Sequence, residues 1–307
     1  MPEYPDLTVY LEALSARALH RVLLDVRLGS PFVLRTAEPP LSSARGKKLI
    51  GLSRIGKRLV FALEGDLFVV IHLMIAGRLF WKPDKAKLAG RVGLAAFDFE
   101  TGTLLLNEVS TKKRAAIHLV KGQVGLEQFD RGGLEVTTAH VDAFAERLRS
   151  ESHTLKRALS DPTLFAGIGN AYSDEILHRA KLSPVKLSRT LNGEEVARLF
   201  TAIQAVLKEW AQRLRDEVKG GWPEKVTAFR PQMAVHGKFR QPCPVCGAPV
   251  QRIVHAENET NYCAPCQTGG RLLADRALSR VLGTDWPRTL EELEERRGGA
   301  LTRRGGG

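Results

Sequence analysis

The chain has 307 residues, a net charge of +12 and an isoelectric point near 9.8. Hydrophobic residues make up 43% of it and charged residues 26%. This balance excludes a disordered basic tail and indicates a globular protein whose basic surface binds nucleic acid or another polyanion. The length indicates two or three domains, and we find neither a signal peptide nor a long apolar segment. We therefore expect a cytoplasmic protein with no membrane segment.

The chain begins with Met1, Pro2 and Glu3. Removal of Met1 would leave Pro2 with a free secondary amine. An α-amino group has a pKa of about 8, well below that of lysine, so part of it is neutral and nucleophilic at cellular pH. Attack of such an amine on an aldehyde carbon gives an iminium ion, and amine nucleophiles of this kind occur in catalysis. An ordinary Met-Pro start without chemistry is the alternative, and these residues alone do not decide between the two.

Apolar spacing predicts a helix over residues 7–18, with Asp6 at the position of its N-cap. Short β-rich runs separated by glycines then follow. Closely spaced strands of this kind indicate an antiparallel sandwich or barrel. The expected strands are 48–52, 58–63, 67–73, 92–99, 103–106 and 116–120.

The pattern becomes helical after about residue 130. We expect helices over 141–148, 154–159, 170–180 and 192–214, with a further one possible over 272–281. Asn170 follows the turn Gly167-Ile168-Gly169 and would open a helix. The exposed N–H groups at such a helix start bind phosphate well, although a glycine-rich turn between helices is more often only a turn.

The four cysteines of the chain form two C-x2-C pairs, separated by sixteen residues. This spacing is typical of four-thiolate zinc sites, with a β-hairpin between the two pairs. A pair of disulfides is the alternative, which a reducing cytosol disfavours. The predicted zinc ligands are Cys243, Cys246, Cys263 and Cys266.

Together these motifs resemble the formamidopyrimidine-DNA glycosylase and endonuclease VIII family of base-excision repair enzymes, over about residues 2–270. The resemblance implies an α+β multidomain fold, in which an antiparallel β-sandwich with a flanking helix precedes a helix–two-turn–helix domain and a C4 zinc-finger hairpin. The expected boundaries are 1–130, 131–230 and 231–270, with a partly disordered extension over 271–307. The resemblance rests on Pro2-Glu3, Ile55-Gly56-Lys57-Arg58, His72-Leu73-Met74-Ile75-Ala76-Gly77, the glycine-rich segment 167–177 and the cysteine pairs.

The same resemblance implies the residue roles. Pro2 would attack C1′ of the damaged nucleoside or of an abasic site, and Glu3 would move protons at the sugar. Lys57 would act with them by binding the phosphate beside the lesion. The residues expected to contact DNA are Lys57, His72, Arg114, Asn170 and His236, and one zinc ion would be structural.

Four features depart from the family pattern. Ile75 occupies the position of a wedge methionine, and Ala115 stands where a wedge aromatic is expected. Asn258 replaces the usual arginine of the finger, and the stretch 222–235 is short for a loop that covers oxidised purines. These departures leave the choice of lesion open.

We therefore expect a monomeric, nucleoid-associated enzyme that acts on damaged DNA as a glycosylase and abasic-site lyase. An abasic-site lyase with little base excision is one alternative. A non-catalytic damage-sensing protein is another, which the presence of both Pro2 and Glu3 disfavours.

Overall fold

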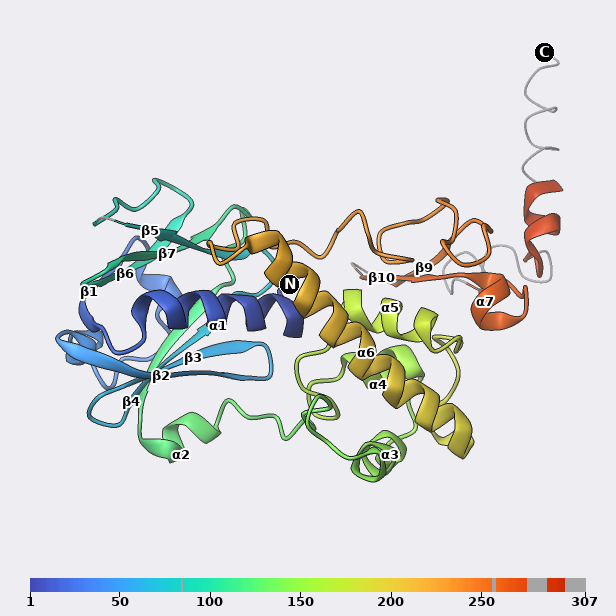
Figure 1. Ribbon diagram of the computed structural model, residues 1–307, viewed down its shortest axis with the longest axis horizontal. Helices are drawn as coiled ribbons and strands as arrows, with labels where there is room; N and C mark the ends of the chain where they lie inside the picture. The colour runs from blue at the N-terminus through green and yellow to red at the C-terminus, as the bar shows by residue number, and fades with distance from the viewer. Residues whose placement is uncertain (84, 256–257, 275–285, 296–307) are drawn as a thin grey trace, which may run out of the picture. The chain divides into compact units, whose positions relative to one another are not determined.

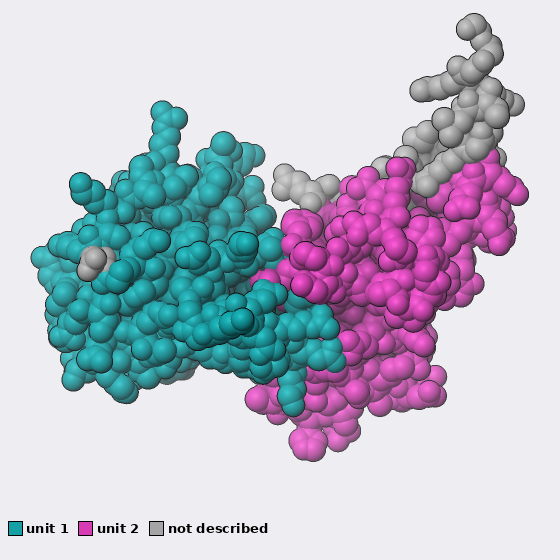
Figure 2. Space-filling view, turned by 45° about the horizontal axis from the view of Figure 1, so that its top comes forward, with its two compact units in different colours: residues 1–135, 165–167, 207–228 teal, residues 136–164, 168–206, 229–307 magenta. Residues whose placement is uncertain are grey.

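The computed structural model describes residues 1–83, 85–255, 258–274 and 286–295. The chain forms two compact units (Figure 2). The first contains residues 1–135, 165–167 and 207–228. The second contains residues 136–164, 168–206 and the chain from 229 onward. None of the helices in the described part of the chain is long and apolar enough to cross a membrane.

The first unit is an antiparallel sheet structure with one long helix beside it (Figure 1). Its eight strands pair in the order β5-β7-β6-β1-β2-β3-β4-β8. The elements are α1 (Tyr4–Ala18), β1 (Val22–Leu28), η1 (Pro31–Val33), η2 (Leu41–Ala44), β2 (Lys47–Ile55), β3 (Arg58–Leu63), β4 (Leu67–His72), β5 (Gly77–Lys82), β6 (Gly93–Phe99), β7 (Gly102–Glu108), β8 (Ala116–Lys121) and α2 (Gly122–Glu127).

The sheet consists of two four-stranded halves that share one hydrophobic core. β1 and β2 join the halves through only two residue pairs, Val22 with Lys48 and Leu23 with Lys47. Phe61 of β3 and Phe97 of β6 come from different halves, and their ring centroids lie 6.0 Å apart. The apolar side of α1 contributes Leu7, Tyr10, Leu14 and Ala18 to the same cluster. The predicted sandwich with a flanking helix is confirmed.

Two strands, β1 and β5, were not predicted. β1 alternates Leu24, Val26 and Leu28 with Asp25 and Arg27, a period of two that is typical of a strand and that was overlooked in the sequence. Their charges are balanced by residues distant in the chain, since Arg27 pairs with Asp98 at 2.6 Å and Asp25 with Arg45 at 2.6 Å. Ion pairs with residues distant in the chain therefore satisfy the charged side chains of this alternating strand.

The second unit contains short helices followed by a small hairpin (Figure 1). The helix predicted from residue 192 is present, and Asn192 caps it, because its Oδ1 accepts the Glu195 N–H at 2.8 Å. Glu195 returns a bond to the Asn192 N–H at 3.1 Å, which completes a capping box. The elements are α3 (Val141–Ser150), α4 (Leu155–Ser160), α5 (Asn170–Arg179), η3 (Ser188–Thr190), α6 (Gly193–Val218, which enters the first unit at residue 207), β9 (Gln251–His255), β10 (Asn258–Tyr262) and α7 (Ala264–Thr268).

One local prediction was wrong, and another falls mostly outside the described residues. Asp6 is not the N-cap of α1: the helix starts at Tyr4, Glu3 is its N-cap, and Asp6 accepts the Glu3 N–H at 3.1 Å. Pro5 fits this earlier start because the first helical turn needs no N–H there. Residues 272–274 are not helical, and 275–281 lie outside the described residues. Leu272 and Leu273 instead pack against Tyr262 and Ala264 of the hairpin region.

Candidate active site and zinc centre

Pro2 and Glu3 are held in a fixed place by the start of α1. Both are buried, and Glu3 is only 3% exposed. The next residue, Tyr4, donates its N–H to the carbonyl of Gly167 at 2.9 Å. Gly167 has a φ of +80°, and a Cβ there would lie 3.1 Å from Arg54 Nη1 and 3.2 Å from Tyr4 Cβ. The first glycine of the motif is therefore needed for a close contact with the N-terminal segment.

The N-terminal amine lies in a charged and partly dry environment. Burial lowers the pKa of the Met1 amine below its ordinary value of 8.0. Glu3 and Asp6 oppose this shift, while the positive charges of Arg78 and Lys57 add to it. Removal of Met1 would bring the Pro2 nitrogen among the same groups. The environment therefore favours the neutral, nucleophilic form of the amine.

Lys57 lies in the turn between β2 and β3, next to Gly56, whose φ is +56°. Arg54 holds this turn by donating to the Gly56 carbonyl at 2.9 Å, and it also pairs with Glu135. Arg54 further stacks on the ring of Tyr4, with its guanidinium carbon 4.6 Å from the ring centroid. One side chain thus connects the turn that carries Lys57 to the residue that follows Glu3.

His72 ends β4 and pairs with Arg58 of β3. Burial, together with the nearby charges of Arg58 and Lys57, lowers the pKa of His72 to about 4. His72 is therefore neutral at cellular pH and could donate one hydrogen bond to a phosphate without adding charge. Pro2, Glu3, Lys57 and His72 thus lie in the first unit, and the charge of Lys57 acts on both the amine and His72.

Arg114 lies in the loop between β7 and β8, and its side chain is exposed. Glu108 holds the end of this loop, because its carboxylate accepts the N–H of Arg114 at 2.8 Å and of Ala115 at 3.0 Å. Ala115 is only 3% exposed and belongs to the core. It cannot act as a wedge in DNA.

An exposed residue of the same loop was missed by the sequence reasoning. Val109 is 79% exposed and Ile75 is 53% exposed. Both lie just beyond the Gly77–Glu108 pair at one end of the β5–β7 ladder. They are the exposed apolar side chains at this end of the ladder among the residues described, and nothing in the local sequence marks Val109.

Asn170 and His236 belong to the second unit. Asn170 opens α5, and its amide donates to the Glu259 carbonyl of β10 at 3.1 Å. His236 is 5% exposed, and its Nδ1 lies 2.8 Å from the Asp174 carboxylate of α5. The neighbouring Glu175 accepts the N–H groups of Ala234, Val235 and His236 at 2.8, 2.9 and 3.0 Å. Asp174 and Glu175 were not predicted, because their partners lie about 60 residues away in the sequence.

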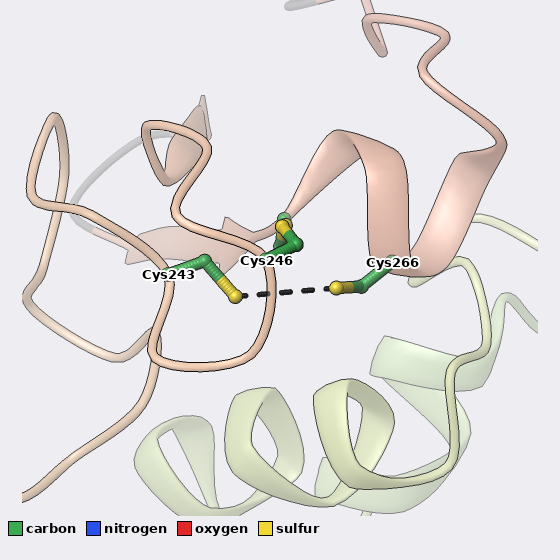
Figure 3. A group of neighbouring side chains, drawn as sticks. Cys243, Cys246 and Cys266 are labelled. Carbon is green, nitrogen blue, oxygen red and sulfur yellow. Dashed lines mark hydrogen bonds between the residues drawn. The ribbon is translucent and has the colours of Figure 1, made fainter.

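The four cysteine sulfurs form a group that fits one zinc ion. All lie within 4.8 Å of one another. Cys243 and Cys266 are 4.0 Å apart (Figure 3), and Cys246 and Cys263 are 3.3 Å apart. A tetrahedral ion with Zn–S bonds of about 2.3 Å separates its sulfurs by about 3.8 Å. The set therefore fits a closed structural zinc, which holds the β9–β10 hairpin and offers no open position for catalysis.

Family models match three segments of the chain. They describe the formamidopyrimidine-DNA glycosylase N-terminal domain over residues 1–119, its H2TH domain over 134–218, and a zinc finger found in FPG and IleRS over 240–269. A formamidopyrimidine-DNA glycosylase of Ligilactobacillus salivarius is 31% identical over 280 residues, which cover 87% of this chain and 99% of the relative. The chain belongs to the formamidopyrimidine-DNA glycosylase family. The predicted family, enzyme class and structural zinc are confirmed.

Solved structures and a second relative agree with this assignment. The Thermus thermophilus protein is 30% identical with a TM-score of 0.71, covering 87% of this chain and 98% of its own. The Lactococcus lactis protein bound to Fapy-dG-containing DNA is 26% identical with a TM-score of 0.77, covering 87% and 100%. An uncharacterised formamidopyrimidine-DNA glycosylase-like protein of Mycobacterium tuberculosis is 40% identical over 149 residues, which are 48% of this chain and 90% of that protein.

The neutral state of His72 predicts an acid sensitivity of the first unit. The pKa is lowered from 6.5 to about 4 on folding, so the unfolded chain binds the extra proton first as the pH falls. The contribution of neutral His72 to the free energy of unfolding is therefore fully present above about pH 6.5. It is lost as the pH falls from 6.5 to 4, by on the order of 2–3 kcal/mol. Urea midpoints of the first unit should fall less over this range in His72→Gln than in the wild type. His140→Gln, at an exposed histidine, should behave as wild type; an equal loss in His72→Gln would contradict the buried neutral state.

The environment of the amine makes a second prediction. The N-terminal amine should react with a small acylating reagent at a lower midpoint pH in the folded protein than in urea, because burial, Arg78 and Lys57 lower its pKa. Lys57→Gln should reduce the difference between the two midpoint pH values. Lys121→Gln changes an exposed lysine at the end of the β4–β8 ladder away from His72, and it should leave the difference unchanged. Quantifying the modified N-terminal peptide by mass spectrometry measures both. Identical midpoints in folded and unfolded protein would rule out the proposed environment.

Proposed function

We propose that this chain excises damaged bases from DNA and cleaves the strand at the resulting abasic site, with Pro2 as its nucleophile. The observation that carries the proposal is the burial of Pro2 and Glu3 at the chain terminus. The Met1 amine that now precedes them has a pKa lowered by burial and by the charges of Arg78 and Lys57. Family membership supports the reaction class. Relatives from Lactococcus lactis have been solved with Fapy-dG-containing DNA and with DNA containing an abasic site.

The reaction follows from the chemistry of a secondary amine. The Pro2 nitrogen bonds to C1′ and gives up its N–H proton, and the damaged nucleobase leaves with the electron pair of the glycosidic bond and takes up a proton. The C1′–O4′ bond then opens, O4′ is protonated, and an iminium ion remains. Transfer of a C2′ proton to a general base breaks the C3′–O bond and releases the strand 3′ to the lesion, which carries the phosphate at its 5′ end. Water finally hydrolyses the iminium ion and frees Pro2.

Glu3 is the group best suited to move these protons. Its carboxylate belongs to the residue bonded directly to Pro2, and it is 3% exposed. Asp6 fixes the Glu3 backbone through its N–H, so the carboxylate can stay near the sugar through several proton transfers. This arrangement supports a dual role for Glu3 as general acid and general base.

The DNA contacts are part of the same proposal. Lys57 would bind the phosphate beside the lesion as a charged group, and His72 would add a neutral donor. Asn170 would offer the N-terminus of α5 to a second phosphate. Arg114 and His236 would contact the strand from the β7–β8 loop and from the segment before the finger. We further propose that the enzyme works as a monomer near the nucleoid, with domains over 1–130, 131–230 and 231–270 and an extension from 271.

Two observations favour poorly stacked substrates over well-paired oxidised purines. Ala115 is buried and cannot serve as a wedge. Among the residues described, Ile75 and Val109 are the exposed apolar side chains at their end of the β5–β7 ladder, and both are smaller than the methionine and the aromatic of the family pattern. The short stretch after α6 is also fixed at its start, because Trp222 donates to the Leu79 carbonyl at 2.8 Å and Val226 accepts from Arg78. A small wedge would fill less of the gap left by the extruded base, and a stretch held at Trp222 and Val226 would cover that base less well. Both would offset less of the free energy that extrusion costs. These observations also support an abasic-site lyase with little base excision as the second candidate.

The nucleophile is tested with borohydride, which reduces the iminium to a stable adduct with DNA. Pro2→Gly should retain some trapping, since a primary amine still forms a Schiff base, and a non-removable N-terminal extension should abolish it. Glu3→Gln should slow strand cleavage by about 10²–10⁴-fold through loss of proton transfer. Glu12→Gln makes the same chemical change on α1 and breaks only a surface pair with Arg215, so it should cleave at the wild-type rate. Undiminished trapping by the extended chain would refute the role of Pro2.

The substrate preference is tested by comparing cleavage rates at one fixed salt concentration. Abasic sites and oxidised pyrimidines, in single or double strands, should be cleaved faster than 8-oxoguanine paired with cytosine. Extrusion of a base costs a few kcal/mol and is least costly for mispaired or single-stranded bases. Excision of 8-oxoguanine opposite cytosine at a rate equal to abasic-site cleavage would show that Ile75 and Val109 suffice as a wedge.

A further inference from the structure

Helix α5 carries a row of polar side chains toward the zinc-finger region. Asn170, Asp174 and His178 are spaced four residues apart, so they lie along one face of the helix. Asn170 bonds to Glu259 of β10, and Asp174 bonds to His236 in the segment before the finger. All of these residues belong to the second unit. The third member of the row, His178, contacts the metal site itself.

The Nε2 atom of His178 lies 3.2 Å from the sulfur of Cys243. Both residues are buried, His178 at 6% and Cys243 at 2% exposed. A site of four thiolates and one Zn²⁺ carries net negative charge, and burying that charge is costly without hydrogen-bond donors. A neutral imidazole with its proton on Nε2 supplies such a donor from outside the finger.

A second bond joins the finger to the chain just after α5. The side chain of Gln267 in α7 accepts the Cys263 N–H at 2.9 Å and donates to the Leu182 carbonyl at 2.9 Å. Two of the four cysteines are therefore connected, one through its sulfur and one through its backbone, to the helix and to the turn that follows it.

We propose that His178 is a positioning residue of the zinc site, which donates a hydrogen bond to the Cys243 thiolate and so couples metal binding to the order of α5. Because α5 begins at Asn170, zinc would also stabilise the helix end that we propose binds phosphate. This last consequence rests on the proposed function. The contact between His178 and the zinc site does not, and it is tested without DNA.

The first test measures zinc release to a coloured chelator from the full chain. His178→Phe keeps a buried aromatic ring but removes the donor, and it should release zinc about tenfold faster or more, the usual effect of losing an outer-shell partner. His178→Gln keeps an N–H donor and should stay close to the wild type. His140→Phe makes the same change at an exposed histidine of the same unit and should release zinc at the wild-type rate.

A spectroscopic readout separates hydrogen bonding from general destabilisation. In the cobalt-substituted protein, the thiolate-to-metal charge-transfer bands should shift in His178→Phe and should be restored in His178→Gln. Wild-type release rates together with unchanged bands in His178→Phe would overturn the proposal. Loss of zinc by the Phe and Gln variants alike would also overturn it, because it would assign His178 a packing role only.

Hydrogen exchange of the wild-type chain provides a test that needs no variant. Removal of zinc should increase exchange of the amides of α5 much more than those of α3, which lies in the same unit. An unchanged α5, or equal increases in the two helices, would overturn the coupling even if no His178 variant folded.

Discussion

The first unit is organised around one constraint: a chain terminus with an ionisable amine is buried. Burial disfavours the charged amine, and Lys57 and Arg78 disfavour it further, while Glu3 and Asp6 balance part of this effect. The hydrogen bond from Glu3 to Asp6 and that from Tyr4 to Gly167 hold the terminus in its place. Burial, which makes the charged amine costly, thus also favours the neutral form that the proposed reaction needs.

In the second unit, buried carboxylates on α5 are paired with groups from other parts of the chain. Asp174 is fully buried, yet Lys156 at 2.5 Å and His236 at 2.8 Å satisfy its carboxylate. Burial raises the pKa of the neighbouring Glu175, and three backbone N–H groups oppose that shift by favouring the carboxylate. Such networks contribute little through net attraction, but removal of one partner leaves a buried charge without compensation. They therefore fix one arrangement of α5 against the segment that leads into the finger.

Local sequence was sufficient to predict a feature of the fold wherever the residues that determine the feature are close together in the chain. The cysteine spacing predicted the zinc ligands, and Asn192 predicted the start of α6. Sequence was insufficient where partners are distant, as for the residues that pair with Asp25 and Arg27 of β1. The N-cap of α1 was misplaced because Asp6 and Glu3 form a reciprocal box in which either acid resembles a cap.

The same limit applies to the site. Motifs led us to propose Pro2, Glu3 and Lys57 as site residues, whereas the positions of Arg78 and Arg54 around the N-terminus emerge only from the folded chain. The resemblance to the family put Ala115 at the position of a wedge aromatic. Its burial and the exposure of Val109 depend on how Glu108 closes the loop, which no local pattern reveals.

The central claim is that the terminal nitrogen of the mature chain forms the covalent intermediate. The most direct measurement is peptide mapping by mass spectrometry of the borohydride-reduced adduct between the wild-type protein and DNA with one abasic site. The account predicts a single modified peptide that begins at Pro2, with the sugar on its α-nitrogen. A crosslink on the side chain of Lys57 or of another internal lysine would contradict it.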